Sequence, residues 1–330
     1  MRFSLRLNND LTLPEYVSLA KTAESVGFDQ FWVSHDLFLR SAPIILSAVG
    51  QATSRIEIGS CIFNPYTINP AELAMMAATL DELTDCRFNL GLAAGAASFL
   101  GWIGLEHGSS LAAMRESIEA VRALLRGEVV ARNGRFLNWQ PDAYLRFPAP
   151  RVTPIYLGAM GPKMLALAGE LADGVLPLLF PPEHYFGVKP IIERGFAKRA
   201  AALPPLDLAA CIWVSLAEEE TAARRVLAEK IADYGSSLRP LILQRLGVTQ
   251  EAFGPIEAAR VEEKDMDKAV GLGDERMMRI GVVGDPKQLL ERLEPLVAAG
   301  VTHLSFGPPL GPDPETAVRM LGEKVLPHFA

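Results

Sequence analysis

The alternation of strand-like and helix-like segments along the whole chain is the feature that most restricts its fold. Short runs of β-branched and aromatic residues are followed, each time, by a longer segment with apolar residues at helical spacing. The eight expected strands are residues 2–7, 31–33, 56–59, 87–92, 154–157, 174–176, 206–216 and 301–306. This alternation predicts parallel strands joined by helices. We therefore expect an eight-stranded α/β barrel, with an open doubly wound sheet as the alternative.

One domain is expected to cover residues 1–330. No change of composition separates the two halves of the chain, which favours the barrel over the open sheet. Residues 236–274 are more polar and lack a strand pattern, so we expect a helical insertion there. Residues 129–150 look irregular, and we expect a small hairpin over the barrel.

Composition excludes several classes of protein. A hydrophobic fraction of 49% and a mean hydropathy of +0.18 allow a large buried core, but no apolar run reaches the ~18 to 20 residues of a membrane span. The net charge of −7 and the absence of a basic run argue against nucleic acid as a partner. Cys61, Cys86 and Cys211 are too few and too dispersed for a disulfide framework or a metal cluster. With no secretion signal at the start, we expect a cytoplasmic protein without a metal site.

The stretch 56–73 shows how a site can form at one end of such a barrel. A strand ends at Gly59, a loop with prolines and asparagines follows, and Asn69-Pro70 begins a helix. In α/β barrels the carboxyl ends of the strands carry the chemistry. An ordinary connecting loop is the alternative for any single stretch of this kind.

Small residues recur at other expected strand ends. They occur in Ser60-Cys61-Ile62, in Ala93-Ala94-Gly95 and in the run from Gly158 to Pro162. Small side chains allow backbone N–H groups to approach a ligand, and the helix after Gly161 offers free N–H groups to an anion. Together these loops predict a site for a phosphorylated cofactor.

His35 and Asp36 follow the second strand and form the best titratable pair in the sequence. An imidazole can transfer a proton near pH 7, and a carboxylate can orient a donor. The alternative is that Asp36 caps the next segment and His35 is an ordinary loop histidine. His107, His184 and His303 are weaker candidates, and the position of His303 inside a strand favours a structural role.

Several segments carry a family resemblance. They are residues 31–36 (FWVSHD), 58–66 (IGSCIFNPY), 79–83 (TLDEL), 90–95 (LGLAAG), 154–162 (PIYLGAMGP), 172–174 (ADG) and 300–312 (GVTHLSFGPPLGP). As a set they resemble the luciferase-like monooxygenase superfamily and, within it, the methylenetetrahydromethanopterin reductases, which use the deazaflavin coenzyme F(420). The similarity covers nearly the whole chain.

The resemblance implies a (β/α)8 TIM barrel of the bacterial luciferase-like type, with insertions. It implies an oxidoreductase that transfers a hydride between coenzyme F(420) and an organic substrate, with a non-prolyl cis peptide between Cys61 and Ile62 behind the ring. The residues implied to contact the cofactor are Ser60, Cys61, Ile62, Asn64, Ala94, Gly95, Gly158, Ala159, Met160 and Gly161.

Three positions depart from the family pattern. The family has an aspartate followed by a histidine after strand two, whereas this chain has His35 and then Asp36. The glutamate that serves the pterin substrate in strand one is replaced by Arg6, and the loop at 91–97 is rich in alanine. We expect His35 and Asp36 beside the ring, Arg6 on the substrate side, and a substrate other than a methylene-pterin.

Two other functions stay open at this point. One is an FMN-dependent luciferase-like monooxygenase that needs oxygen, and the other is a non-catalytic barrel that only binds a flavin or a partner. The small-molecule substrate is expected to be bound by the variable regions 100–110, 129–150 and 236–274. The resemblance also implies a homodimer that pairs through barrel helices.

Overall fold

The computed structural model describes residues 1–106 and 108–330, so His107 lies outside the described residues. Ten strands form one sheet in which every pair is parallel. They are β1 (Arg2–Leu7), β2 (Gln30–Val33), β3 (Glu57–Ser60), β4 (Phe88–Leu92), β7 (Ile155–Gly158), β8 (Gly174–Leu176), β9 (Asp207–Leu208), β10 (Ala210–Leu216), β11 (Val282–Gly284) and β12 (His303–Leu310). The eight segments expected as strands all contain one, and β11 was not expected.

The sheet closes into a barrel through β9 and β10, which are separated only by Ala209. β9 pairs with β8, whereas β10 pairs with β12, which in turn pairs with β1. The continuous segment of β9 and β10 therefore joins the strand pair at one edge of the sheet to the strand pair at the other edge. β11 pairs with the last residues of β10. The barrel is confirmed, and the open doubly wound sheet is wrong.

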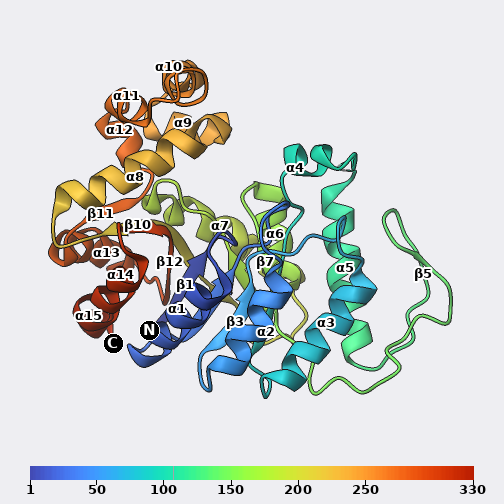
Figure 1. Cartoon of the computed structure of the whole chain (residues 1–330). Helices are drawn as coiled ribbons and strands as arrows, with labels where there is room; N and C mark the ends of the chain where they lie inside the picture. Colours follow the sequence, from blue (N-terminus) through green and yellow to red (C-terminus); the bar gives the residue numbers. More distant parts are fainter. Residues whose placement is uncertain (107) are drawn as a thin grey trace.

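Helices surround the barrel (Figure 1). They are α1 (Leu13–Ser25), α2 (Ala42–Ala52), α3 (Pro70–Leu83), α4 (Ala97–Trp102), α5 (Ser110–Leu125), α6 (Pro162–Leu171), α7 (Tyr185–Gly195), α8 (Glu220–Tyr234), α13 (Pro286–Ala298), α14 (Pro314–Met320) and α15 (Leu326–Phe329). Their starts follow capping chemistry, because the Asn69 side chain accepts the Ala71 N–H at 3.0 Å and Asp285 forms a capping box with Gln288. Within the described ranges, no helix combines the length and apolarity that crossing a membrane requires.

Successive side chains of a strand point to opposite faces of the sheet, so the two faces of each strand contact different surroundings. In β1, Phe3, Leu5 and Leu7 are buried in the apolar core, whereas Ser4 and Arg6 take part in hydrogen bonds of the barrel interior. The barrel interior is therefore partly polar, and its polar side chains come from strands that are far apart in sequence.

The segment expected as a helical insertion is helical. It contains α9 (Pro240–Leu246), α10 (Gly254–Glu257) and α11 (Met266–Gly271), and α12 (Glu275–Met278) follows directly. Its apolar residues form a second cluster with α8 that includes Leu227, Ile231 and Phe253. In Figure 1 these helices and α4 lie at the end of the barrel opposite the two chain termini, which is the carboxyl end of the strands.

The expected hairpin is present, but its expected position was wrong. It consists of β5 (Arg132–Asn133) and β6 (Asn138–Trp139), which are antiparallel. The carboxylate of Glu116 on α5 accepts the N–H groups of residues 135, 136 and 137 at 2.8 to 3.0 Å. These bonds hold the hairpin against the outer side of α5, away from the barrel end (Figure 1).

Candidate active site

At the amino-terminal end of the strands, the barrel interior contains four polar side chains that bond to one another. Arg2 Nη1 lies 3.0 Å from Asp207 Oδ2, and the Tyr156 hydroxyl donates to the same oxygen at 2.8 Å. His303 Nδ1 lies 3.0 Å from Asp207 Oδ1. Burial alone raises the pKa of Asp207, but the hydrogen bond from His303, together with Tyr156 and Arg2, lowers it to about 2. We call these four residues the barrel floor, and the structural role predicted for His303 is confirmed.

A chain of hydrogen bonds runs from the floor toward the carboxyl end of the strands. His303 Nε2 lies 2.8 Å from Ser4 Oγ, and Ser4 Oγ lies 2.7 Å from Ser305 Oγ. Arg6 Nε donates to Ser305 Oγ at 3.0 Å. The floor and Arg6 thus belong to one buried network, although no acidic side chain of that network contacts Arg6.

Arg6 lies at the upper end of this network and is only 5% exposed. Its Nη2 donates to the Ile212 carbonyl oxygen at 3.1 Å. A Cβ atom on Gly307 would lie 2.4 Å from this Nη2, so only glycine leaves room for the guanidinium. In the described part of the chain, no carboxylate forms an ion pair with Arg6. It is therefore a buried cation held by neutral groups, and it faces the carboxyl end of the barrel.

The loop after β3 contains a cis peptide between Cys61 and Ile62, as expected. Burial raises the pKa of the Cys61 thiol to about 12 even though Arg6 is near, so this side chain is not a thiolate at neutral pH. A Cβ on Gly158 would lie 3.2 Å from Ile62 Cγ2 and 3.1 Å from Ala93 Cβ. The loops after β3, β4 and β7 therefore meet closely at this point.

Ser60 and Asn64 use their side-chain oxygens to fix these loops. Ser60 Oγ donates to the Gly91 carbonyl oxygen at 2.9 Å and accepts the Gly91 N–H at 3.0 Å. Asn64 Oδ1 accepts the N–H groups of Tyr66 and Thr67 at 3.1 and 2.9 Å. Both side chains are buried, so their part in a site is to position the backbone around them.

The run from Gly158 to Gly161 leads from β7 into α6. Ala159 is buried, and Met160 packs against the apolar cluster of the insertion. Gly161 is the N-cap of α6 and Pro162 is its first residue, with no side-chain cap for the N–H groups that follow. In the loop after the neighbouring strand β4, Ala94 is half-buried and Gly95 is exposed. Free N–H groups at a helix start fit an anion such as a phosphate.

His35 and Asp36 follow β2 at the same end of the barrel. His35 Nδ1 accepts the Ala42 N–H at 3.3 Å, and burial lowers the pKa of the imidazole. Burial raises the pKa of Asp36, against the opposing effect of Lys230. The buried side chain of Asn9 holds this loop, because its Oδ1 accepts the Asp36 N–H at 3.1 Å and its Nδ2 donates to the Asp36 carbonyl oxygen at 3.0 Å.

Three further residues reach this end of the barrel and were not singled out by the sequence. Lys230 and Tyr234 lie on α8, and Trp213 lies on β10. Against the larger effect of burial, Lys230 lowers the pKa of Asp36, and burial together with the charge of Asp36 raises the pKa of Tyr234. The sequence suggested only an exposed, charged helix for α8, so nothing in it could identify these side chains. We call His35, Asp36, Arg6 and Lys230 the titratable residues of the barrel mouth.

Comparison with known proteins identifies the family. The sequence profile described as Luciferase-like monooxygenase matches residues 1–303. The chain belongs to the luciferase-like monooxygenase family. The resemblance expected from the sequence segments is therefore confirmed.

Within this family, the chain is similar to the 5,10-methylenetetrahydromethanopterin reductase of Archaeoglobus fulgidus, with 30% identity over 100% of both chains. It is 31% identical to the protein of the same name from Methanopyrus kandleri, over 99% of this chain and 98% of that one. The solved structure of the coenzyme F(420) dependent tetrahydromethanopterin reductase from Methanopyrus kandleri matches with a TM-score of 0.90, 30% identity, and coverage of 100% and 99%.

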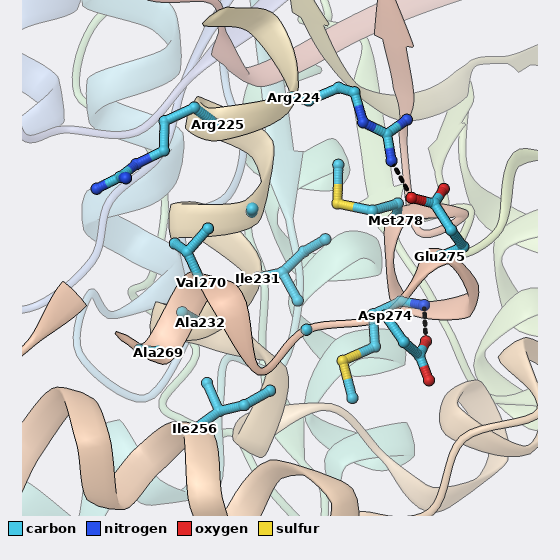
Figure 2. Close-up of a pocket in the computed structure, with 13 residues that line it drawn as sticks. Arg224, Arg225, Ile231, Ala232, Ile256, Ala269, Val270, Asp274, Glu275 and Met278 are labelled. Carbon is cyan, nitrogen blue, oxygen red and sulfur yellow. Dashed lines mark hydrogen bonds and ion pairs between the residues drawn. The ribbon is translucent and has the colours of Figure 1, made fainter. Parts of the chain in front are cut away.

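One cavity of this luciferase-like chain lies away from the residues of the barrel mouth. A cavity of about 320 Å³ lies in the insertion, between α8, α10, α11 and α12. Figure 2 shows its apolar side chains and the ion pair between Arg224 and Glu275 at its edge. Apart from position 107, which the structure does not describe, no three His, Cys, Asp or Glu side chains are grouped to hold a metal ion.

Proposed function

We propose that this protein is an oxidoreductase that transfers a hydride between the deazaflavin coenzyme F(420) and a small organic substrate. The observation that carries the proposal is the match over the full chain length, at a TM-score of 0.90, to an enzyme described as coenzyme F(420) dependent. The reductases of the same description from two organisms are 30% and 31% identical over nearly the whole chain. F(420)-dependent glucose-6-phosphate dehydrogenases are also similar, at 27% and 28% identity.

The residues of the barrel mouth fit such a coenzyme. The backbone of Cys61 and Ile62 lies where the loops after β3 and β4 meet β7, and we propose that a flat ring lies against this backbone. The uncapped start of α6 at Gly161 suits the phosphate of the coenzyme. When bound, the coenzyme supplies the hydride chemistry, and the protein supplies binding, orientation and electrostatics.

His35 and Asp36 are proposed to form hydrogen bonds with polar groups of the substrate beside the ring and to exchange protons with them. Because His35 Nδ1 accepts an N–H and its pKa is lowered, the neutral imidazole carries its proton on Nε2 and can donate it in a hydrogen bond. Asp36 is half-buried, and its raised pKa favours exchange of a proton nearer to neutral pH.

The substrate is proposed to differ from a methylene-pterin because of Arg6. A guanidinium stays protonated at every physiological pH and cannot donate a proton as a carboxylic acid does. Arg6 instead offers a fixed positive charge and hydrogen-bond donors to the substrate side of the site.

The test is titration of the purified protein with oxidised and reduced deazaflavin and with FMN, followed by quenching of tryptophan fluorescence. We expect tight binding of the deazaflavin alone. Gly158→Val should weaken this binding at least tenfold, because the added side chain would displace Ile62 and Ala93 from the point where the three loops meet. Gly271→Ala is the matched control, since no atom lies within 4 Å of the added carbon. Preference for FMN with a requirement for oxygen would establish the monooxygenase alternative, and binding without turnover would support the non-catalytic barrel.

We further propose a homodimer that pairs through α2 and α3. Ile44, Met75 and Leu83 on these helices are 60%, 51% and 43% exposed, and with Pro43 and Met76 they form an apolar surface. Sedimentation should give a dimer for the wild type and a monomer for Met75→Glu. Val261→Glu places the same charge on another residue that is 52% exposed and should leave the dimer intact. A monomeric wild type would disprove the pairing.

We also propose a cytoplasmic location and no role in nucleic-acid binding. Cys61, Cys86 and Cys211 are all free thiols, which is the usual state in a reducing compartment. The net charge of −7 disfavours association with a phosphate backbone.

A further inference from the structure

The side chain of Lys230 is held by two aromatic rings at the barrel mouth. Its Nζ lies 5.7 Å from the centroid of the Trp213 ring and 5.5 Å from that of the Tyr234 ring. The two rings contact each other edge to face, with centroids 5.8 Å apart. An ammonium over two aromatic faces is stabilised without a counter-ion. The position of the Lys230 charge is therefore fixed by the rings, because within the described residues it forms no ion pair with a carboxylate.

Trp213 also connects Lys230 to Arg6. In the pairing of β10 with β12, Trp213 lies opposite Gly307. The guanidinium of Arg6 occupies the space over Gly307 and bonds the carbonyl oxygen of Ile212, the residue before Trp213. Lys230 on α8 therefore lies over the Trp213 ring, and Arg6 on β1 bonds the backbone directly before Trp213.

The charges around this tryptophan do not balance. In the described ranges, neither Lys230 nor Arg6 forms an ion pair. Other lysines do, since Lys268 pairs with Glu263 at 2.7 Å and Lys324 with Glu218 at 2.6 Å. Asp36 is the acidic group whose pKa Lys230 lowers, and burial works against its ionisation. Two cations thus share at most one carboxylate, in a chain whose net charge is −7.

We propose that Lys230 and Arg6 together bind an anionic group of the substrate, a carboxylate or a phosphate, with Trp213 and Tyr234 holding Lys230 in place. This inference rests on the proposed function in taking the ligand to be the substrate of hydride transfer. The planar guanidinium of Arg6, on β1, donates N–H groups to the anion. The ammonium of Lys230, on α8, adds a second positive charge. Both donors lie on the side of the mouth formed by β1, β10 and α8, apart from the α6 start proposed for the phosphate of the coenzyme.

An anionic group of the coenzyme is the other possible source of the charge, and the test separates the two. Inorganic phosphate and malonate are titrated into the purified protein by calorimetry, before and after saturation with deazaflavin. The variants are Lys230→Gln, Lys230→Arg and Arg6→Met. Lys287→Gln is the matched control, because it removes one positive charge from a side chain that is 84% exposed on an outer helix.

We expect at least one of the two anions to bind the wild type and the coenzyme-saturated protein. Lys230→Gln should weaken that binding at least tenfold, and Lys230→Arg should restore it to within threefold. Lys287→Gln should change it less than twofold. The affinity for deazaflavin should change less than twofold in Lys230→Gln. Lys230 is half-buried and forms no ion pair in the described ranges, so this variant is expected to fold, and the test does not depend on the folding of Arg6→Met.

Three results would overturn the proposal. The wild type could fail to bind either anion, with no heat beyond that of dilution. Anion binding could be the same in Lys230→Gln as in the wild type. Saturation with deazaflavin could abolish anion binding while Lys230→Gln weakens deazaflavin, which would assign both cations to the coenzyme. Failure to bind deazaflavin, with Lys230-dependent anion binding intact, would instead disprove the proposed function alone.

Discussion

The charged side chains at the two ends of the barrel interior differ in whether they are paired with an opposite charge. At the floor, Asp207 is bonded by Arg2, Tyr156 and His303, and its pKa falls to about 2. At the mouth, Arg6 and Lys230 have no ion pair in the described chain, and the pKa of Asp36 is raised by burial. Paired charges stabilise a fold, whereas unpaired ones are available to a ligand.

The difference follows from what each end must do. The floor charges are bonded to other protein groups, so a buried polar atom that loses its partner there would destabilise the folded state. A charge at the mouth gains its partner only when a molecule binds. Without that molecule the unpaired charge lowers the free energy of unfolding. Substitutions of the same kind at the two ends should therefore have opposite consequences.

The largest expected effect is that of Asp207→Asn at the floor. It removes the charge that holds Arg2 and His303, and we expect the free energy of unfolding to fall by about 2 to 3 kcal/mol. Urea unfolding at pH 7 measures the loss, and the affinity for deazaflavin should stay within twofold. Glu218→Gln, on a side chain that is 70% exposed, is the control and should change stability little. An unchanged midpoint for Asp207→Asn would end the view of the floor as a stabilising cluster.

The second effect is the pH dependence that Asp207 confers. Its pKa is about 2 in the folded protein against an ordinary value of 3.8, so the folded state favours the ionised form. The resulting stabilisation, about 2 kcal/mol, is complete above the ordinary value and is lost as the pH falls toward the folded value. Between about pH 4 and pH 2 the wild type should lose more stability than Asp207→Asn does. Parallel slopes for the two proteins would contradict this.

The third effect has the opposite sign and concerns Asp36→Asn at the mouth. Because burial raises the pKa of Asp36, the folded state disfavours the ionised carboxylate, and wild-type stability falls as the pH rises through the folded pKa. Removing the charge should stabilise the protein at pH 7 by about 0.5 kcal/mol. Turnover, in contrast, should fall at least tenfold. If this variant is destabilised as much as Asp207→Asn, the contrast between the two ends is wrong.

The smallest expected effect measures how far the two ends are coupled. Ser4 and Ser305 link His303 to Arg6 through contacts of 2.7 to 3.0 Å. A double-mutant cycle of Asp207→Asn and Arg6→Met should give a coupling free energy of about 0.5 kcal/mol, because both groups belong to one network. The same cycle in a Ser4→Ala background should give none. Equal coupling in both backgrounds would show that the hydroxyl chain does not transmit it.

Much of the fold could be predicted from local sequence. The strand 2–7 and the helix 70–83 were predicted with the bounds that the structure has, because alternating apolar residues, Asn69 and Pro70 are local signals. The missed elements are short. Helix α4 has six residues and β11 has three, too few to show a period. The hairpin was misplaced because its position depends on Glu116, which lies on another element.

Less of the candidate site could be predicted. The sequence indicated which loops end at the carboxyl edge of the barrel, and it singled out His35, Asp36 and Arg6 from residue type and family resemblance. It could not indicate that Ser60 and Asn64 use their side chains to fix loops. Nor could it identify Lys230, which is one of several charged residues on a helix whose orientation depends on packing against the barrel.

The sequence by itself determined the order of strands and helices, the family, and the types of side chain at the strand ends, because these depend on spacing and on short motifs. Only the tertiary structure decided which charges are paired. Arg2 and Asp207 are 205 residues apart and meet because the barrel closes through β9 and β10. Arg6 bonds the strand of Trp213, and Lys230 lies over the Trp213 ring, for the same reason. The spacing of residues along the chain does not encode such contacts. They form only when elements that are distant in sequence pack together, which removes water and fixes the side chains between them.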